Sequence, residues 1–96
     1  MRAEYDSVAD ALSIDLAPAE RWDRAEGVDA DYCTVSFAGH EPANVELIAP
    51  REHLDLLAQA AERFGLDGEA LEAAARSALA APDRIVVLDV LARATR

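Results

Sequence analysis

The period of the hydrophobic residues changes once along the chain, at Pro50, and this change constrains the fold more than any other feature. Before Pro50, apolar and polar residues alternate in short runs, whereas after it Leu and Ala recur at positions i, i+3 and i+4. A period of two is typical of strands with one buried face, and a period of about 3.6 is typical of amphipathic helices. The sequence therefore predicts an α+β fold in which the strands come first and the helices second.

A β-hairpin is expected at the start of residues 1–49. Two alternating runs, near 2–5 and 12–16, flank the segment DSVAD, which begins with Asp6 and ends with Asp10. Asp and Ser side chains can bond nearby backbone N–H groups and so favour a tight reversal of the chain. Both Asp residues are therefore expected to be structural turn residues.

Two further strands are expected before the helices. Alternation at 33–38 and at 44–48 frames the turn signal GHEP. Residues 17–31 are polar and contain Pro and Gly, so they are interpreted as a connection with a short extended piece near 21–24. The four strands together predict a small antiparallel β-meander.

Residues 50–82 are expected to form a helical hairpin packed on one face of the sheet. Pro50 suits the first position of a helix, because its missing N–H would be unbonded there. Gly65 can end this helix in the left-handed conformation, and Asp67 can cap the next one. Pro82 would stop the second helix.

The C-terminal segment, 83–96, contains the β-branched run IVVLDVL and is expected to add a fifth strand. This strand should be more deeply buried than the others or packed at an interface, with Val86 and Leu88 as candidate interface residues. Trp22 is a third candidate, because large aromatic residues flanked by charges are favoured at interfaces; alternatively it lies over the end of the sheet core. The residues expected to supply most of the core are Leu12, Ile14, Leu16, Val35, Phe37, Val45, Leu47, Leu57, Phe64, Leu71, Leu79, Val87 and Val90.

The net charge argues against several classes of partner. The 96 residues suit one domain and carry 19 acidic residues, nine Arg and no Lys, for a net charge of −10. Residues 1–49 hold eleven acids and three Arg, a net charge of −8. Phosphate backbones and anionic membranes attract positive charge, so neither nucleic acid nor a membrane is an expected partner. A basic protein would suit the acidic half, and so would a surface that is simply solvated.

The remaining composition points to a cytoplasmic protein that self-associates. No apolar run approaches the ~20 residues of a membrane span, and the start MRAEYD has no apolar signal region. The single cysteine, Cys33, cannot form an internal disulfide. The 22 Ala residues each bury little area, and oligomerisation is a common remedy for a thin core. A homodimer is therefore expected.

The opening YDSVADALSIDL, at 5–16, resembles a small prokaryotic family, the domain of unknown function family numbered 2283. That family opens with Tyr-Asp, three variable residues and Asp-Ala-Leu-Tyr-Ile, and a later strand reads roughly Gly-Ile-Glu-Ile, which NVELI at 44–48 resembles. The resemblance covers residues 1–49 and departs from the pattern at Ser13, where Tyr is usual, and at Asn44, where Gly is usual. It implies a small β-meander without an established activity. It also implies a relation to the smaller partner of toxin–antitoxin gene pairs.

Residue types that carry chemistry are present, but they form no recognised catalytic, cofactor or metal motif. Cys33, His40 and His53 could act as zinc ligands or as a Cys–His nucleophile pair, yet a zinc site usually needs three or four ligands. The cysteine also lies among apolar neighbours on its strand. Ser7 and Ser36 lack a surrounding motif that would activate them. No cofactor is expected.

The acidic residues have two readings. Asp6 and Asp10 could act as paired carboxylates for acid–base work or for a cation, but the flanking strands favour a turn pinned by their side chains. Asp29 and Asp31 would point the same way on an extended segment. A Ca²⁺ site needs six or more oxygens in a shaped loop, so a solvated acidic edge is the favoured interpretation.

The two predicted helices resemble a helix-turn-helix in their spacing, over residues 58–79. A recognition helix enters the major groove with basic or amide side chains. The second helix instead begins with Glu69 and Glu72, which would repel phosphate. The pattern therefore favours an αα-hairpin that packs on the sheet.

The function predicted from the sequence is a non-enzymatic protein-interaction module that forms a homodimer. One alternative is an acidic, antitoxin-like regulator that masks a basic partner. A second alternative is a small-ligand binder or enzyme of unknown type, which none of the residues supports directly.

Overall fold

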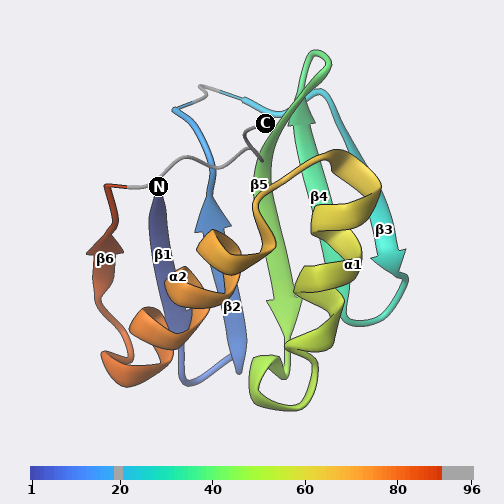
Figure 1. Ribbon diagram of the computed structural model, residues 1–96. Coiled ribbons are helices and arrows are strands. Elements are labelled where there is room, and N and C mark those ends of the chain that lie inside the picture. Colours follow the sequence, from blue (N-terminus) through green and yellow to red (C-terminus); the bar gives the residue numbers. More distant parts are fainter. Residues whose placement is uncertain (19–20, 90–96) are drawn as a thin grey trace.

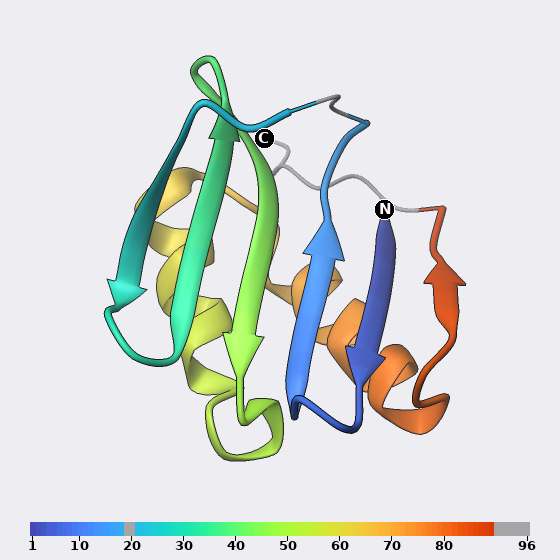
Figure 2. The same ribbon diagram turned by 180° about the vertical axis from the view of Figure 1, so that it is seen from behind.

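A computed structural model describes residues 1–18 and 21–89 (Figure 1). Within this part of the chain the fold is α+β, with an antiparallel six-stranded sheet whose order is β3-β4-β5-β2-β1-β6. A helical hairpin covers one face of the sheet and leaves the other uncovered by helices (Figure 2). The strands are β1 (Arg2–Asp6), β2 (Ala11–Asp15), β3 (Arg24–Asp29), β4 (Cys33–Ala38), β5 (Glu41–Ile48) and β6 (Ile85–Val87). The predicted fold class is confirmed.

The sheet is built from two hairpin-connected units that meet at β2 and β5. The strands β1 and β2 form the predicted hairpin, and β3, β4 and β5 form a second run of antiparallel neighbours. Leu12 lies opposite Leu47 and Ile14 lies opposite Val45, and all four side chains are fully buried. The period-two alternation of both strands thus places their apolar residues on the face that the helices cover.

The strand β3 is the main addition to the predicted meander, which had about five strands. Residues 17–31 were expected to be a connection with an extended piece only near 21–24, but pairing with β4 runs from Arg24 to Asp29. No residue of β3 is buried, because it is an edge strand. A strand without a buried apolar face lacks the alternation by which strands are recognised.

The helical half follows most of the predicted signals but begins differently. Pro50 starts a 3₁₀ turn, η1 (Pro50–Glu52), and the chain leaves helical geometry at His53 before α1 (Asp55–Phe64) begins. The His53 ring Nδ1 lies 2.9 Å from the Ala49 carbonyl oxygen, and its ring stacks on Tyr32 at 4.0 Å. These contacts hold the residue outside the helix, so the single helix predicted from Pro50 to Phe64 is wrong in its first turn.

The junction between the helices was predicted correctly. Gly65 adopts the left-handed conformation with φ 67°, and the Leu66 N–H donates to the Ala61 carbonyl at 2.9 Å. The Asp67 side chain then caps α2 (Gly68–Ala80) by accepting from the Ala70 N–H at 3.1 Å. Gly65 thus ends α1 and Asp67 starts α2 two residues later. This short junction directs the two helices onto the same sheet face.

The core lies between the sheet and the helical hairpin. The helix α2 packs on β1 and β2 while α1 packs on β3 and β4. Three Ala residues of α2, Ala74, Ala75 and Ala78, are fully buried, so this helix approaches the sheet closely. The predicted core residues that are buried are Leu12, Ile14, Leu16, Val35, Phe37, Val45, Leu47, Leu57 and Leu71, whereas Phe64 and Leu79 are partly buried and pack against them. Val90 lies outside the described residues.

The strand β6 is short and exposed, which corrects the prediction of a deeply buried last strand. Ile85 is 60% exposed and Val87 is 73% exposed, so Val87 is not a core residue. The reason is that β6 lies at the sheet edge, where Ile85 and Val87 pair with the exposed residues Glu4 and Arg2 of β1. Among residues 1–18 and 21–89, no helix is long and apolar enough to cross a membrane.

The cap of α2 gives a direct test of this local architecture. We expect Asp67→Ala to lower the free energy of unfolding by about 1 kcal/mol, because the Ala70 N–H loses its acceptor. Asp67→Asn is the matched control and should unfold close to the wild type, since Asn caps helices as well as Asp does. Chemical denaturation measures both variants. Equal stability of all three proteins would contradict the role assigned to this side chain.

Candidate functional site

A cavity of about 430 Å³ opens at the end of β2, on the segment that leads toward β3. Trp22 forms an aromatic part of its lining and is 51% exposed. The Arg2 guanidinium donates to an Asp15 carboxylate oxygen at 3.2 Å, so the two charges in the lining compensate each other. The lining residues are Met1, Arg2, Asp15, Leu16, Ala17, Pro18 and Trp22. Such a hollow suits an apolar or aromatic group better than an ion.

Asn44 is buried beside this cavity and ties two strands together. Its Nδ2 donates to the Ser13 hydroxyl and to the Asp15 carboxylate, each at 2.8 Å. The hydrogen bond between Ser13 and Asn44 joins β2 to β5.

Asp6 and Asp10 both serve the hairpin turn, but through different contacts. Asp6 Oδ1 accepts from the backbone N–H groups of Val8 and Ala9 at 3.0 and 3.1 Å, which is the local turn contact expected of an Asp side chain. Asp10 adopts a left-handed conformation with φ 51°, and its carboxylate accepts from the Tyr5 hydroxyl at 2.6 Å. The hydrogen bonds that hold these carboxylates differ, which is not the arrangement of a carboxylate pair that shares a proton.

Tyr5 joins the turn to the start of the helical half. Arg51 donates to the Tyr5 hydroxyl at 3.3 Å, and its guanidinium lies 5.1 Å from the centre of the ring. The hydrogen bond to Asp10 raises the pKa of Tyr5 above its ordinary value. The phenol therefore stays protonated at neutral pH and acts as a hydrogen-bond donor that holds the turn.

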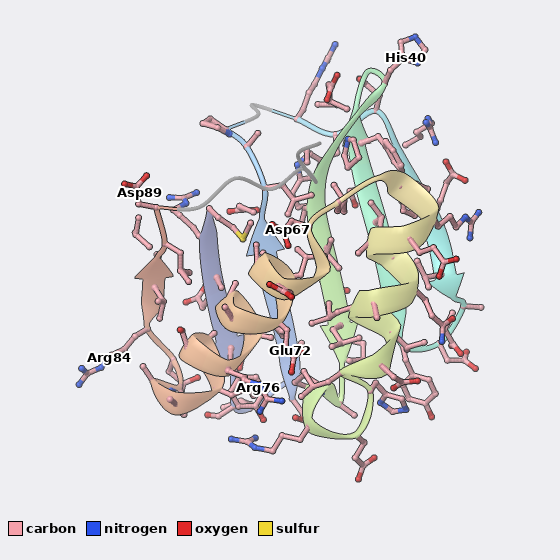
Figure 3. All side chains as sticks on the ribbon, in the orientation of Figure 1. His40, Asp67, Glu72, Arg76, Arg84 and Asp89 are labelled. Atoms are coloured by element: carbon pink, nitrogen blue, oxygen red, sulfur yellow. The ribbon has the colours of Figure 1, made fainter. Side chains whose placement is uncertain are left out.

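Cys33, His40 and His53 are not brought together. Cys33 is buried, and burial raises the pKa of its thiol to about 11, which keeps it protonated and unreactive. His53 stacks on Tyr32, whereas His40 projects from the turn between β4 and β5 (Figure 3). Among the described residues, no group of three or more His, Cys, Asp or Glu side chains could hold a metal ion. A Cys–His pair is therefore not formed.

The acidic residues near β3 are engaged by backbone groups and cations of the chain itself. Asp29 Oδ1 accepts from the N–H groups of Asp31 and Tyr32 at 2.9 and 3.2 Å, so it closes a turn, and Asp31 lies in that turn rather than beside it on a strand. Asp23 accepts from the Gly39 N–H. Glu26 lies between two Arg side chains. These acidic residues therefore stabilise the β3 edge of the sheet and do not form a cation site.

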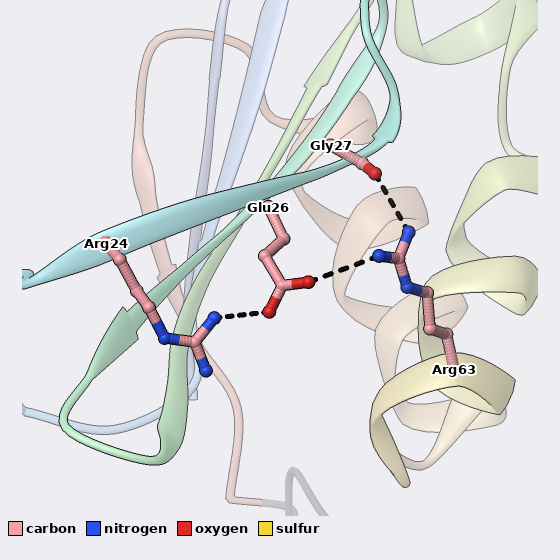
Figure 4. Close-up of polar contacts among 4 residues, drawn as sticks. All are labelled: Arg24, Glu26, Gly27 and Arg63. Atoms are coloured by element: carbon pink, nitrogen blue, oxygen red, sulfur yellow. Dashed lines mark hydrogen bonds and ion pairs between the residues drawn. The ribbon is translucent and has the colours of Figure 1, made fainter.

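The β3 edge is closed by α1. Arg63 of α1 donates to the Gly27 carbonyl at 2.9 Å and to Glu26 at 3.2 Å, and Arg24 binds the other oxygen of Glu26 (Figure 4). The pairing of β3 with β4 also shifts register between Gly27 and Asp29. A carbonyl bound by a side chain and an irregular register both hinder the addition of another strand.

Among residues 1–18 and 21–89, no side chain or element covers the β6 edge in this way. Val86 and Leu88, the predicted interface residues, are half-buried on the core side, and Leu88 packs against the core cluster. Their contribution to an interface stays a prediction. The exposed apolar side chains of this edge are instead Ile85 and Val87.

Asp83, in the turn before β6, is anchored by a contact that sequence reasoning missed. Asp83, with φ 62°, accepts from the Ser7 hydroxyl at 2.6 Å and from the Ser7 N–H at 2.9 Å. The two residues are 76 positions apart, and no local signal links them. The contact fixes the start of β6 against the β1–β2 turn.

Comparisons of the chain with protein-family models, with curated proteins and with solved structures gave no match. The assignment of a function therefore rests on the geometry of the described residues.

The Ser7–Asp83 contact predicts a specific dependence on pH. The hydrogen bond from the Ser7 hydroxyl lowers the pKa of Asp83 most, and the bond from the Ser7 N–H lowers it further. The contact therefore stabilises the fold at pH values above the usual Asp pKa of about 3.9. This stabilisation is lost as the pH falls through the lowered pKa. We expect Ser7→Ala to raise the pKa of Asp83 and to move acid unfolding to higher pH. An NMR titration of the side-chain carboxyl carbons measures the first effect.

Ser36→Ala is the matched control for this titration, since Ser36 lies on β4, away from Asp83. It should leave the pKa of Asp83 unchanged. An unchanged pKa in Ser7→Ala as well would show that the hydroxyl does not stabilise the charged carboxylate.

Proposed function

We propose that this protein is a non-enzymatic protein-interaction module that associates with a second copy of itself. The observation that carries the proposal is the exposed apolar character of β6, where Ile85 is 60% and Val87 is 73% exposed on an edge strand. Proteins that stay monomeric normally shorten, charge or cover such an edge, because it can pair with another chain. This edge is short, but it is neither charged along its exposed face nor covered by a described element.

The composition of the core supports the same proposal. Ala supplies much of the face that α2 presents to the sheet, including the fully buried Ala74, Ala75 and Ala78. Ala buries little apolar area, and a domain of this size has little stability to spare. Covering Ile85 and Val87 on association would add apolar burial that the monomer lacks.

The contacts of the reactive side chains support a non-enzymatic role. The Cys33 thiol is buried, the Asp6 carboxylate binds backbone N–H groups, and Asp83 binds Ser7. The two carboxylates thus have structural hydrogen-bond partners, and the thiol belongs to the core. In the cavity beside Trp22, the charged pair is likewise satisfied internally.

Self-association is tested by sedimentation equilibrium from low to high micromolar protein. We expect a concentration-dependent dimer for the wild type and a monomer for the double variant Ile85→Thr/Val87→Thr. Thr keeps the preference for extended backbone while removing much of the apolar surface. Val8→Thr is the matched control, because Val8 is 96% exposed but lies in the β1–β2 turn. A wild-type monomer throughout this range would overturn the proposal.

A second candidate function is an acidic regulator that binds a basic protein. It is favoured by the open face of the sheet, where Glu4 and Glu46 lie on either side of Ser13 in one row across β1, β2 and β5. Both carboxylates are exposed, and neither forms an ion pair with another described residue. A basic surface would complement this row, which matches the toxin–antitoxin relation that the opening sequence implies.

For this candidate we expect the wild type to retain a small basic protein, identified by mass spectrometry and then shown to rebind in purified form. The double variant Glu4→Gln/Glu46→Gln should bind that protein more weakly, and the difference should shrink at high salt because exposed charges are screened. Asp31→Asn, a neutralisation in the turn after β3, is the control. Retention of the same partner by the double variant with equal affinity would contradict this candidate.

A further inference from the structure

The lining of the cavity beside Trp22 contains two opposite charges that are direct neighbours. Arg2 at the start of β1 lies opposite Asp15 at the end of β2, and both residues line the cavity (Figure 1). The Arg2 guanidinium donates to Asp15 Oδ2 at 3.2 Å and makes no other side-chain hydrogen bond within residues 1–18 and 21–89. Arginine has five N–H donors, so most of the hydrogen-bonding capacity of this side chain is unused.

The carboxylate of Asp15 is held in position by a buried side chain. Asn44 is 2% exposed, and its Nδ2 donates to Asp15 Oδ1 at 2.8 Å. The same Nδ2 donates to the Ser13 hydroxyl, so both N–H groups of this amide are used and its orientation is fixed. A carboxylate can accept about four hydrogen bonds, of which Asn44 and Arg2 supply two. Asp15 is therefore fixed in orientation but retains acceptor capacity.

The rest of the lining is largely apolar and includes an accessible aromatic ring. Trp22 is 51% exposed, and its ring makes no stacking or cation–π contact with another residue of the described part of the chain. Met1 and Leu16 add apolar surface beside it. The volume of about 430 Å³ lies within the range of ~300–1,000 Å³ in which small molecules bind, usually among apolar side chains with a few polar groups.

We infer that this cavity binds a free amino acid with an aromatic side chain. At neutral pH such a molecule carries a carboxylate that can accept from Arg2 and an ammonium that can donate to Asp15, while its ring can stack on Trp22. Both ligand charges are attached to the same carbon atom, which suits two protein charges that are hydrogen-bonded neighbours. The inference does not depend on the proposed self-association, because Ile85 and Val87 do not line this cavity.

Ligands with one charge or none fit this lining less well. An anion would leave the Asp15 carboxylate without a matching charge, and the net charge of −10 repels anions. A cation would leave the Arg2 guanidinium without one. An uncharged aromatic molecule would displace water from both groups without replacing its hydrogen bonds, which is unfavourable. A zwitterion matches both protein charges and has no net charge of its own.

Binding is measured through Trp22, which is the only tryptophan of the chain. We expect phenylalanine to change the Trp22 fluorescence saturably, with excitation where phenylalanine does not absorb. Leucine lacks the ring, hydrocinnamate lacks the ammonium and phenethylamine lacks the carboxylate, so each should bind at least about tenfold more weakly. Calorimetry repeats each titration and detects binding that leaves the emission unchanged. No binding at millimolar phenylalanine, or equal affinity for phenylalanine and any of the three analogues, would overturn the inference.

Two substitutions test which protein group binds which ligand charge. Asp15→Asn should weaken phenylalanine binding at least about tenfold without weakening hydrocinnamate binding, because only the ammonium contact is lost. Arg2→Gln should weaken phenylalanine binding without weakening phenethylamine binding. The Arg2 and Asp15 side chains are 60% and 36% exposed, so neither substitution should unfold the protein. Arg24→Gln is the matched control, since Arg24 lies on β3 and pairs with Glu26. Equal losses in all three variants, or equal losses for phenylalanine and its analogues, would contradict the inference.

Discussion

The pairing of β2 with β5 is the interaction on which the rest of the structure depends. It joins a unit made of β6, β1 and β2 to a unit made of β3, β4 and β5, and its Leu12–Leu47 and Ile14–Val45 neighbours are fully buried. The two helices divide the covering of this sheet, since α2 packs on β1 and β2 and α1 packs on β3 and β4. The contact between α1 and α2 therefore crosses the boundary between β2 and β5 on the covered face of the sheet, and it holds the two units in one core.

The fold could be predicted wherever the signal was local. Alternation located β1, β2, β4 and β5, and the Gly65 and Asp67 signals located the junction between the helices. The strand β3 was missed, because an edge strand that buries little apolar surface has no alternation to detect. The exposure of β6 was also missed. An apolar run shows that a strand can be buried, but whether a helix covers it depends on distant residues.

The contacts of the candidate site were likewise predictable only between residues close in the sequence. The Asp6 turn was predictable, because its partners lie two and three residues away. The partners of Asp83 and of Arg63 lie 76 and 36 residues away, and only the folded sheet brings these groups together. Short-range chemistry thus explains the turns, whereas the difference between the two sheet edges arises from tertiary contacts.

The difference between the β3 and β6 edges gives the strong acidity of the chain a physical role. Charges along β3 and across the open face discourage unselective pairing of sheets, and a net charge of −10 opposes approach in most orientations. Ile85 and Val87 of β6 are therefore the exception on a surface whose net charge opposes association in most orientations.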